Sequence, residues 1–309
     1  MSGRLNKTRA ILTQISKQRL LFIMVLPVLV YYLIFNYVPM YGVVIAFKQL
    51  RITQGILASP WVGFVHFVDV FTDARFYRVL GNTLVISLYQ LAIVFPAPII
   101  VAILLNEMKG LKIRRVTQTI IYLPRFLSWT IIAGLTINVF SLDYGIVNRV
   151  LVEQLGMQPL NLMTDPRNFR HFLVLTLLWR ATGWSSIIYF AALSSINPEL
   201  YDAAHVDGAG RWRSIWHITL PGILPTISIL LILRIGNMLD VGFEQVFNLY
   251  NPAVLRTGDI LDTFVFRIGI QEGRYSYATA VGLFRSVVAL VLILGANKAV
   301  KSMGQEGFF

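Results

Sequence analysis

Six stretches of mostly apolar residues, each about 20 residues long, restrict this chain to a membrane. A helix that crosses a bilayer needs roughly 20 such residues, because the hydrocarbon core is about 30 Å thick and each residue advances the helix by about 1.5 Å. The chain is 56% hydrophobic and only 14% charged, which excludes an ordinary soluble domain. The sequence therefore predicts an all-α membrane protein with six transmembrane helices, at about 20–38, 82–105, 117–140, 171–193, 222–243 and 277–296.

Prolines and glycines mark where these helices are expected to bend or stop. Pro96 and Pro98 lie inside the second predicted span and Pro124 lies inside the third, so both helices are expected to kink. The fifth span is the most interrupted. A turn is predicted at Pro39–Gly42, just after the first span.

The net charge of +12 is compatible with either a nucleic-acid-binding protein or a membrane protein. Lys and Arg cluster at the span ends rather than along one soluble face, which favours the membrane and argues against a nucleic-acid partner. If the N-terminus is cytoplasmic, the cytoplasmic segments carry about twice the density of Lys and Arg of the external ones. The positive-inside rule therefore places both termini in the cytoplasm.

The two ends of the chain define its expected domains. Residues 1–19 are basic, with Ile11, Leu12 and Ile15 at helical spacing, and form either a surface helix or a solvated cytoplasmic tail. The apolar run that follows is long and has no small-residue cleavage site, so it is predicted to be a retained first span. Residues 20–309 then form one membrane domain. The chain has no cysteine, which removes disulfides and thiolate metal sites.

Residues 197–221, between the fourth and fifth spans, have the pattern of a short exposed helix, a turn and a second helix. Pro198 suits the first turn of a helix, Glu199 and Asp202 suit its positive end, and Ala203 favours helix. Gly208 follows where the helix should stop. A compact exposed helix of this kind can lie in a groove of another protein, and a motor subunit can then push on the helix.

This segment resembles the coupling loop of the membrane permeases of bacterial ATP-binding-cassette importers. The residues in the family's register are Asp202, Ala203, Ala204, Gly208, Ile218, Leu220 and Pro221. Asp202 replaces the usual glutamate, a mild change. The resemblance implies a type I importer bundle with a cytoplasmic coupling helix, and an ATPase-coupling loop formed by Glu199, Tyr201, Asp202, Ala203, Ala204, Asp207, Gly208, Ala209, Ile218, Leu220 and Pro221.

Four further segments look like the saccharide-importing subgroup of the maltose-type permeases, which includes importers of alginate and of pectin-derived oligosaccharides. These segments are 39–48, 122–129, 241–245 and 275–284. The resemblance implies transport of an oligo- or polysaccharide, with an acidic one as a narrower hypothesis. It also implies that the chain lies in the inner membrane of a bacterium, with a second permease, two ATPase subunits, an external solute-binding protein and membrane lipid as partners. No phosphate-binding loop motif is present, so ATP and Mg²⁺ are expected on the partner ATPases, with no cofactor, metal or catalytic site in this chain.

Polar and aromatic residues in or near the third, fourth and fifth spans are candidates for the solute path. Charges inside a membrane are costly and usually face a bundle interior or water, and aromatic rings stack on sugars. The alternative is that these side chains pair with one another, for example Arg234 with Asp240, and only hold the bundle together. The candidates are Trp129, Asn138, Arg180, Trp184, Ser185, Tyr189, Asn237, Asp240, Glu244, Gln245 and Asn248. Arg180 and Arg125 are the expected partners of an acidic saccharide.

Two other classes of membrane protein would require different residues. An ion-coupled secondary transporter would use intramembrane carboxylates without an ATPase, and the coupling-loop pattern argues against it. A membrane-embedded enzyme needs a nucleophile–base pair or a metal cluster in the bilayer, and the four histidines lie outside the predicted spans or at their ends. The chain is therefore expected to be a transport subunit and not an enzyme.

Overall fold

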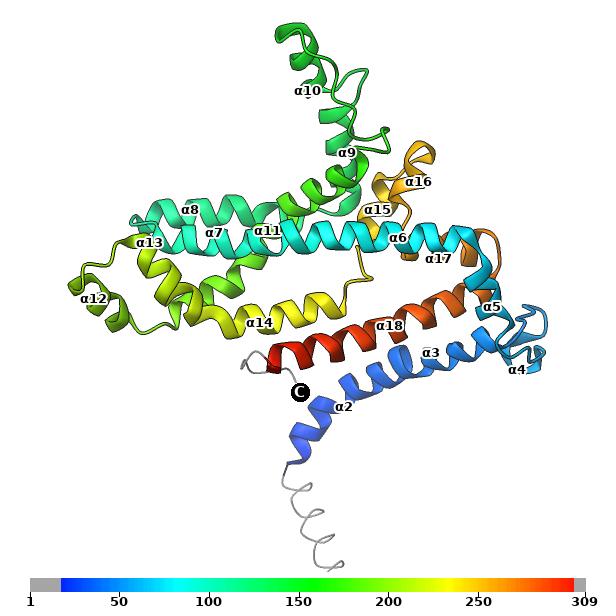
Figure 1. Cartoon of the computed structure of the whole chain (residues 1–309). Coiled ribbons are helices and arrows are strands. Elements are labelled where there is room, and N and C mark those ends of the chain that lie inside the picture. Colours follow the sequence, from blue (N-terminus) through cyan, green and yellow to red (C-terminus); the bar gives the residue numbers. More distant parts are fainter. Residues whose placement is uncertain (1–17, 303–309) are drawn as a thin grey trace, which may run out of the picture.

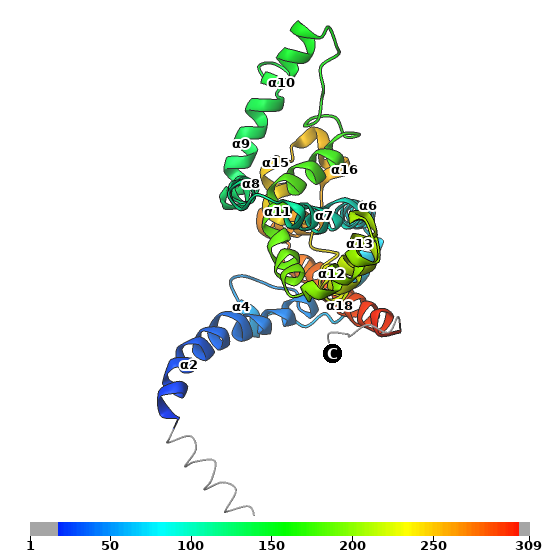
Figure 2. The same cartoon turned by 90° about the vertical axis from the view of Figure 1, so that its left-hand side faces the viewer.

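The computed structural model describes residues 18–302, except for the side chain of Phe22, and this part of the chain is a bundle of long helices. The long helices run side by side, short helices cap both ends of the bundle, and an arm made of α9 and α10 points away from it (Figures 1 and 2). No strand occurs within residues 18–302, apart from a single bridge between Lys48 and Trp61. The predicted N-terminal segment 1–19 lies almost wholly outside the described residues.

The α-helices in chain order are α2 Arg19–Tyr32, α3 Val38–Met40, α4 Gly55–Ala58, α5 Val65–Thr72, α6 Ala74–Tyr89, α7 Pro96–Glu107, α8 Leu111–Tyr122, α9 Trp129–Phe140, α10 Ile146–Arg149, α11 Phe169–Ser194, α12 Pro198–Val206, α13 Arg211–Ser214, α14 Leu220–Gly236, α15 Phe243–Leu249, α16 Leu255–Gly258, α17 Leu261–Phe266 and α18 Tyr275–Ser302. Single turns of 3-10 or π-helix join many of them. These turns are η1 Leu33–Tyr37, η2 Tyr41–Phe47, η3 Gln90–Val94, η4 Leu123–Phe126, η5 Val150–Gln154, η6 Ile215–Thr219, η7 Pro252–Val254 and η8 Arg267–Gln271.

Within residues 18–302, five continuous helical stretches are long and apolar enough to cross a membrane. They are Arg19–Phe47, Ala74–Glu107, Phe169–Ser194, Arg211–Gly236 and Tyr275–Ser302. A sixth crossing is reached if Leu111–Phe126 and Trp129–Phe140 count as one broken span, bent by 102°. The all-α class and the positions of the spans agree with the prediction, but three helices differ in detail.

The third span is not the continuous helix that was predicted over 117–140. Leu127 and Ser128 adopt extended backbone, and the Ser128 hydroxyl accepts a hydrogen bond from the Ile131 N–H at 3.3 Å. This is the geometry of a helix N-cap, which starts α9 in a new direction. Pro124 lies in the 3-10 turn η4 just before the break, so the predicted kink is in fact a break three residues later.

The prediction for the fifth span is wrong at its end. The helix stops at Gly236, and a turn over 237–242 follows before α15 begins at Phe243. Gly242 has φ of +101° at that point. The polar residues predicted to share one helix are therefore divided between the end of α14 and α15.

The first span is longer than predicted, and the turn predicted at Pro39–Gly42 is helical instead. The wider π-turn η1 precedes Pro39, with the Val38 N–H bonded to the Leu33 carbonyl. Such a turn accommodates a residue that lacks its own N–H, so the proline does not end the helix. The side chains of this span remain exposed over most of its length.

Buried apolar clusters hold the remaining helices together. One cluster packs α6, α9, α11 and α15 through residues such as Ile86, Ala133, Phe172 and Val246. A second joins α5, α6, α17 and α18 at the end of the bundle opposite α12. A third packs α7, α11 and α14 nearer to α12. The helices that carry the predicted coupling loop and path residues therefore share one packed framework.

Candidate functional site: an exposed coupling helix and a broken span

The helix α12 starts at a side-chain cap. The Asn197 side-chain oxygen accepts a hydrogen bond from the Glu199 N–H at 3.1 Å, and its amide nitrogen donates to the Glu199 carboxylate at 3.1 Å. Pro198 occupies the first helical turn, where its missing N–H costs nothing. Glu199 lies at the positive end of the helix dipole.

The end of α12 depends on Gly208, which has φ of +77°. The Ala209 N–H returns to the Ala204 carbonyl at 2.8 Å, and the Gly208 N–H donates to the His205 carbonyl at 3.1 Å. A residue in the left-handed region closes the last turn in this way, and glycine adopts it without strain. The result is a helix of nine residues with both ends capped.

One contact fixes α12 to the base of the fifth span. The Tyr201 hydroxyl lies 3.1 Å from the hydroxyl of Thr219, which is buried at the end of η6. Ile218 and Leu220 are half-buried beside it, and Pro221 lies in the first turn of α14. The contact therefore ties α12 to the membrane-spanning stretch Arg211–Gly236.

The end of the bundle that carries α12 and α13 has exposed apolar side chains on its outward surface, although contact with water would favour polar ones. Val206 is 88% exposed and Trp212 is 77% exposed, and Leu200 and Trp216 are exposed as well. The structure thus brings the predicted coupling residues to one end of the molecule, in α12, the turn after it and the start of α14 (Figure 1). Exposed apolar patches of this kind mark contact surfaces for other proteins.

Four of the predicted path residues gather at the break between α8 and α9. The Arg180 guanidinium lies over the Trp129 ring, 4.7 Å from its centroid, and its Nε donates to the Leu127 carbonyl at 3.2 Å. Asn248 accepts a hydrogen bond from the Thr130 hydroxyl at 3.2 Å and donates to the backbone carbonyl of Glu244 at 2.7 Å. The charged groups that act on Arg180 are Arg125 and Glu244, so the break has two cations and one anion.

Four further predicted residues line a cavity of about 660 Å³ between α7, α11 and α14. They are Trp184, Ser185, Tyr189 and Asn237. Arg234 lines the same cavity and donates a hydrogen bond to the buried Gln90 side chain. Its hydrogen-bond partner is therefore Gln90 and not Asp240, the partner given as the alternative in the sequence analysis. Trp184 also packs edge-on against Phe126 at the break, with ring centroids 5.8 Å apart. The cavity and the break are therefore neighbours along α11.

The remaining path candidates have other surroundings. Gln245 is 1% exposed and its amide nitrogen donates to the Leu173 carbonyl and the Thr176 hydroxyl, so it holds α15 against α11. Asp240 forms an ion pair with Arg285 at 3.4 Å, and Arg285 also contacts Asp262. Burial, together with the negative charge of Asp240, raises the pKa of Asp262 above its ordinary value against the opposing effect of Arg285. Asn138 is exposed farther along α9.

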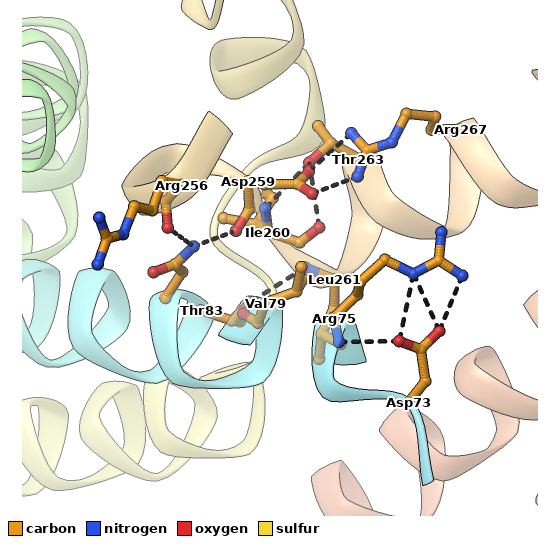
Figure 3. A network of polar contacts seen from close by, with 11 residues as sticks. Asp73, Arg75, Val79, Thr83, Arg256, Asp259, Ile260, Leu261, Thr263 and Arg267 are labelled. Atoms are coloured by element: carbon orange, nitrogen blue, oxygen red, sulfur yellow. Dashed lines mark hydrogen bonds and ion pairs between the residues drawn. The ribbon is translucent and has the colours of Figure 1, made fainter. Parts of the chain in front are cut away.

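A buried polar network at the other end of the bundle was missed by the sequence analysis (Figure 3). Asn82 donates to the carbonyls of Arg256 and Asp259, at 3.1 Å each, and accepts from Arg170 at 2.7 Å. Asp259 in turn pairs with Arg267. In the sequence, the arginines of this network stand out only as charges near the ends of spans. A single asparagine in an apolar helix likewise gives no sign of a partner far away in the chain. Within residues 18–302, no group of three or more His, Asp or Glu side chains is placed to hold a metal ion.

The fold and this pair of sites define the permease class of type I ATP-binding-cassette importers. The structure matches the permease in a crystal structure of a bacterial ABC transporter involved in the import of the acidic polysaccharide alginate, with a TM-score of 0.88 and 42% identity over 95% of this chain and 99% of that one. A second structure of the alginate transporter, in complex with a periplasmic protein carrying an alginate pentasaccharide, matches with the same score and identity.

Residues 94–297 match the family of binding-protein-dependent transport system inner membrane components, and the chain belongs to this family. Two curated relatives from Bacillus subtilis (strain 168) agree. The polygalacturonan/rhamnogalacturonan transport system permease protein YteP is 43% identical over 98% of this chain and 94% of its own length. Protein LplB is 46% identical over 96% of this chain and 92% of its own length. The predicted family and fold class are confirmed.

Proposed function

We propose that this chain is one of two permease subunits of an ATP-driven importer for an acidic oligo- or polysaccharide. Its substrate would be delivered by an external solute-binding protein, as the complex of the alginate transporter with its periplasmic protein suggests. The description of YteP names polygalacturonan and rhamnogalacturonan, which contain acidic galacturonate units, and the matched crystal structure is of an importer of alginate, an acidic polysaccharide. The comparisons support the carbohydrate class, and the charges of this chain support the acidic one.

The observation that carries the acidic class is the pair of arginines at the broken span. Arg180 is held on the Trp129 ring by its Nε hydrogen bond, which leaves its terminal nitrogens free to bind a carboxylate. Arg125 is exposed at the same break, and neither arginine forms an ion pair within residues 18–302. A guanidinium matches a sugar carboxylate in a bidentate manner, and the indole face offers a stacking surface beside it.

ATP and Mg²⁺ would be bound by two partner ATPase subunits that dock under the two permeases through their coupling loops, which in this chain include α12, with both termini and α12 in the cytoplasm. The exposed apolar residues of α12 and α13 support this docking surface. Residues 20–309 would then act as one membrane domain whose two partner-facing elements are α12 and the break. The path would be completed by the second permease.

The experiment uses the complete importer reconstituted in vesicles, with trigalacturonate and its methyl ester as paired substrates. The double substitution Arg125→Gln and Arg180→Gln is expected to lower uptake of the acid by about tenfold or more, since a charge-assisted hydrogen bond contributes about 1.5–3 kcal/mol. Uptake of the ester should change little. Arg149→Gln, which removes an exposed arginine on α10, is the matched control.

Each other result has a defined meaning. Equal loss for acid and ester would show that the arginines hold the fold and do not select charge. Uptake that continues on an ion gradient without the ATPases would replace the importer by the secondary-transporter alternative.

A further inference from the structure

The end of the bundle opposite α12 contains a cavity of about 570 Å³ lined by four arginines. Arg75 and Arg78 come from the first turns of α6, Arg256 from α16 and Arg267 from η8. Val79, Leu255, Asp259 and Phe264 complete the lining. One lining carboxylate therefore faces four guanidinium groups.

Two of these arginines are already paired. Arg75 forms an ion pair with Asp73 at 2.9 Å, and Arg267 pairs with Asp259, which also accepts a hydrogen bond from the Thr263 hydroxyl at 2.8 Å (Figure 3). Burial raises the pKa of the Asp73 carboxyl, but the hydrogen bonds and the charge of Arg75, with a hydrogen bond from Tyr277, together outweigh burial, so this pKa lies below its ordinary value. Glu272 is the other carboxylate that acts on Arg75 and Arg267.

The other two arginines, Arg78 and Arg256, have no hydrogen bond or ion pair from their side chains within residues 18–302. Both are exposed at the cavity. They leave the cavity with a net positive charge even after Asp73, Asp259 and Glu272 are counted. Two unpaired guanidinium groups that converge on one cavity suit an oxyanion with several acceptor oxygens.

The cavity is built on a rigid frame. Asn82, which is 3% exposed, fixes the carbonyls of Arg256 and Asp259, and Arg170 of α11 donates to Asn82 and to the Thr257 carbonyl. The Leu261 N–H donates to the buried Thr83 hydroxyl at 3.0 Å. These contacts hold the turn that carries Arg256 against α6, independently of the charged ends of Arg78 and Arg256.

The position of the cavity favours a lipid over a transported solute. The span that begins at Ala74 has 34 residues, about 50 Å, so its first turns extend beyond the hydrocarbon core into the headgroup layer. Phe71 and Tyr77 are exposed at the same level, where interfacial aromatic residues gather. None of the lining residues is a candidate for the solute path. The broken span packs against a later part of α6, through the buried cluster of Ile86, Ala133 and Val246 that joins α6 to α9 and α15.

We propose that Arg75, Arg78, Arg256 and Arg267 form a binding pocket for the phosphate of an anionic phospholipid headgroup, in the leaflet opposite the coupling helix. Basic pockets between membrane helices recognise such headgroups. Here Arg78 and Arg256 would supply unpaired hydrogen-bond donors, and the two paired arginines would add positive electrostatic potential. The bound lipid would brace the turn 255–260 against the start of the second span. This site is independent of the identity of the transported sugar.

The test compares lipid retention by the intact importer, purified from vesicles of phosphatidylglycerol and phosphatidylcholine, using native mass spectrometry. Wild type should retain phosphatidylglycerol in preference to phosphatidylcholine. The double substitution Arg78→Gln and Arg256→Gln should weaken this preference about thirtyfold, the factor that corresponds to about 1 kcal/mol for each arginine. Arg51→Gln with Arg149→Gln removes the same charge from exposed positions outside the pocket and should retain the preference.

Two competitors identify the source of the anion. Inorganic phosphate and trigalacturonate, each at millimolar concentration, should leave the bound phosphatidylglycerol in place. Displacement by phosphate would mean a soluble-anion site, and displacement by trigalacturonate would mean a sugar subsite, so either result overturns the lipid assignment. Unchanged lipid preference in the pocket variant overturns it as well.

Discussion

Single residues decide whether the coupling helix has a defined end. Gly208 has φ of +77°, a conformation that costs a residue with a Cβ about 1–2 kcal/mol. Apart from Gly208 itself and its two chain neighbours, no heavy atom of residues 18–302 lies within 4 Å of the place where a Cβ would sit, so the strain at this position is conformational only. The Gly208→Ala substitution is therefore expected to raise local opening of residues 198–209 by about tenfold, measured by hydrogen exchange of the intact complex.

The neighbouring glycine supplies the control for this prediction. Gly210 has φ of −77° and open space around its Cβ position, so Gly210→Ala should leave the exchange of α12 unchanged. If both alanine variants exchange alike, the positive φ at Gly208 does not determine how α12 ends. Loss of sugar-stimulated ATP hydrolysis in Gly208→Ala alone would additionally connect the end of the helix to coupling.

At the scale of helices, the half-span α8 depends on one close approach to α11. A Cβ at Gly183 would lie 1.9 Å from the backbone carbonyl oxygen of Ile121, a distance that side-chain movement cannot relieve. The Gly183→Ala substitution must push the two helices apart, and overpacking of this kind costs about 1–3 kcal/mol. We expect the thermal denaturation midpoint of the purified importer to fall by several degrees.

A glycine in the other half of the broken span should respond in the opposite direction. Apart from the neighbouring backbone of α9 itself, no heavy atom of the described residues lies within 4 Å of the Cβ position of Gly134, so Gly134→Ala adds about 1 kcal/mol of helix propensity without a clash. The thermal denaturation midpoint of the importer with Gly134→Ala should stay the same or rise. A fall in both variants would contradict the assignment of the effect to the contact between Gly183 and Ile121.

The sequence predicted most of the helices, because apolar length is a local property that survives any tertiary arrangement. The coupling loop was also predictable, since its cap, its alanines and its glycine lie within a few residues of one another. The break at Leu127 and Ser128 was not, because a serine between apolar residues becomes a cap only when the next helix has somewhere else to pack. The partners of Gln245 and Asn82 lie about 70 to 180 residues away and leave no local pattern.

For the whole molecule, connectivity fixes which surfaces share a side of the membrane. Counting the broken span as one crossing, an odd number of crossings separates α4 from α12, so Leu57 and Val206 must lie on opposite sides. Both side chains are highly exposed, and the chain contains no cysteine, so single cysteines at these positions report on them without background. The positive-inside rule predicts that α12, the proposed docking surface for the ATPases, lies on the cytoplasmic side.

Labelling of intact cells with a membrane-impermeant maleimide tests this orientation directly. Leu57→Cys should react in intact cells, whereas Val206→Cys should react only in inside-out vesicles. In those vesicles, labelling of Val206→Cys should fall several-fold when the partner ATPases are present, because an apolar residue at a docking surface loses access to water when the partner binds. Labelling of Val206→Cys in intact cells would reverse the topology. Equal labelling with and without the ATPases would place their docking surface elsewhere than on α12.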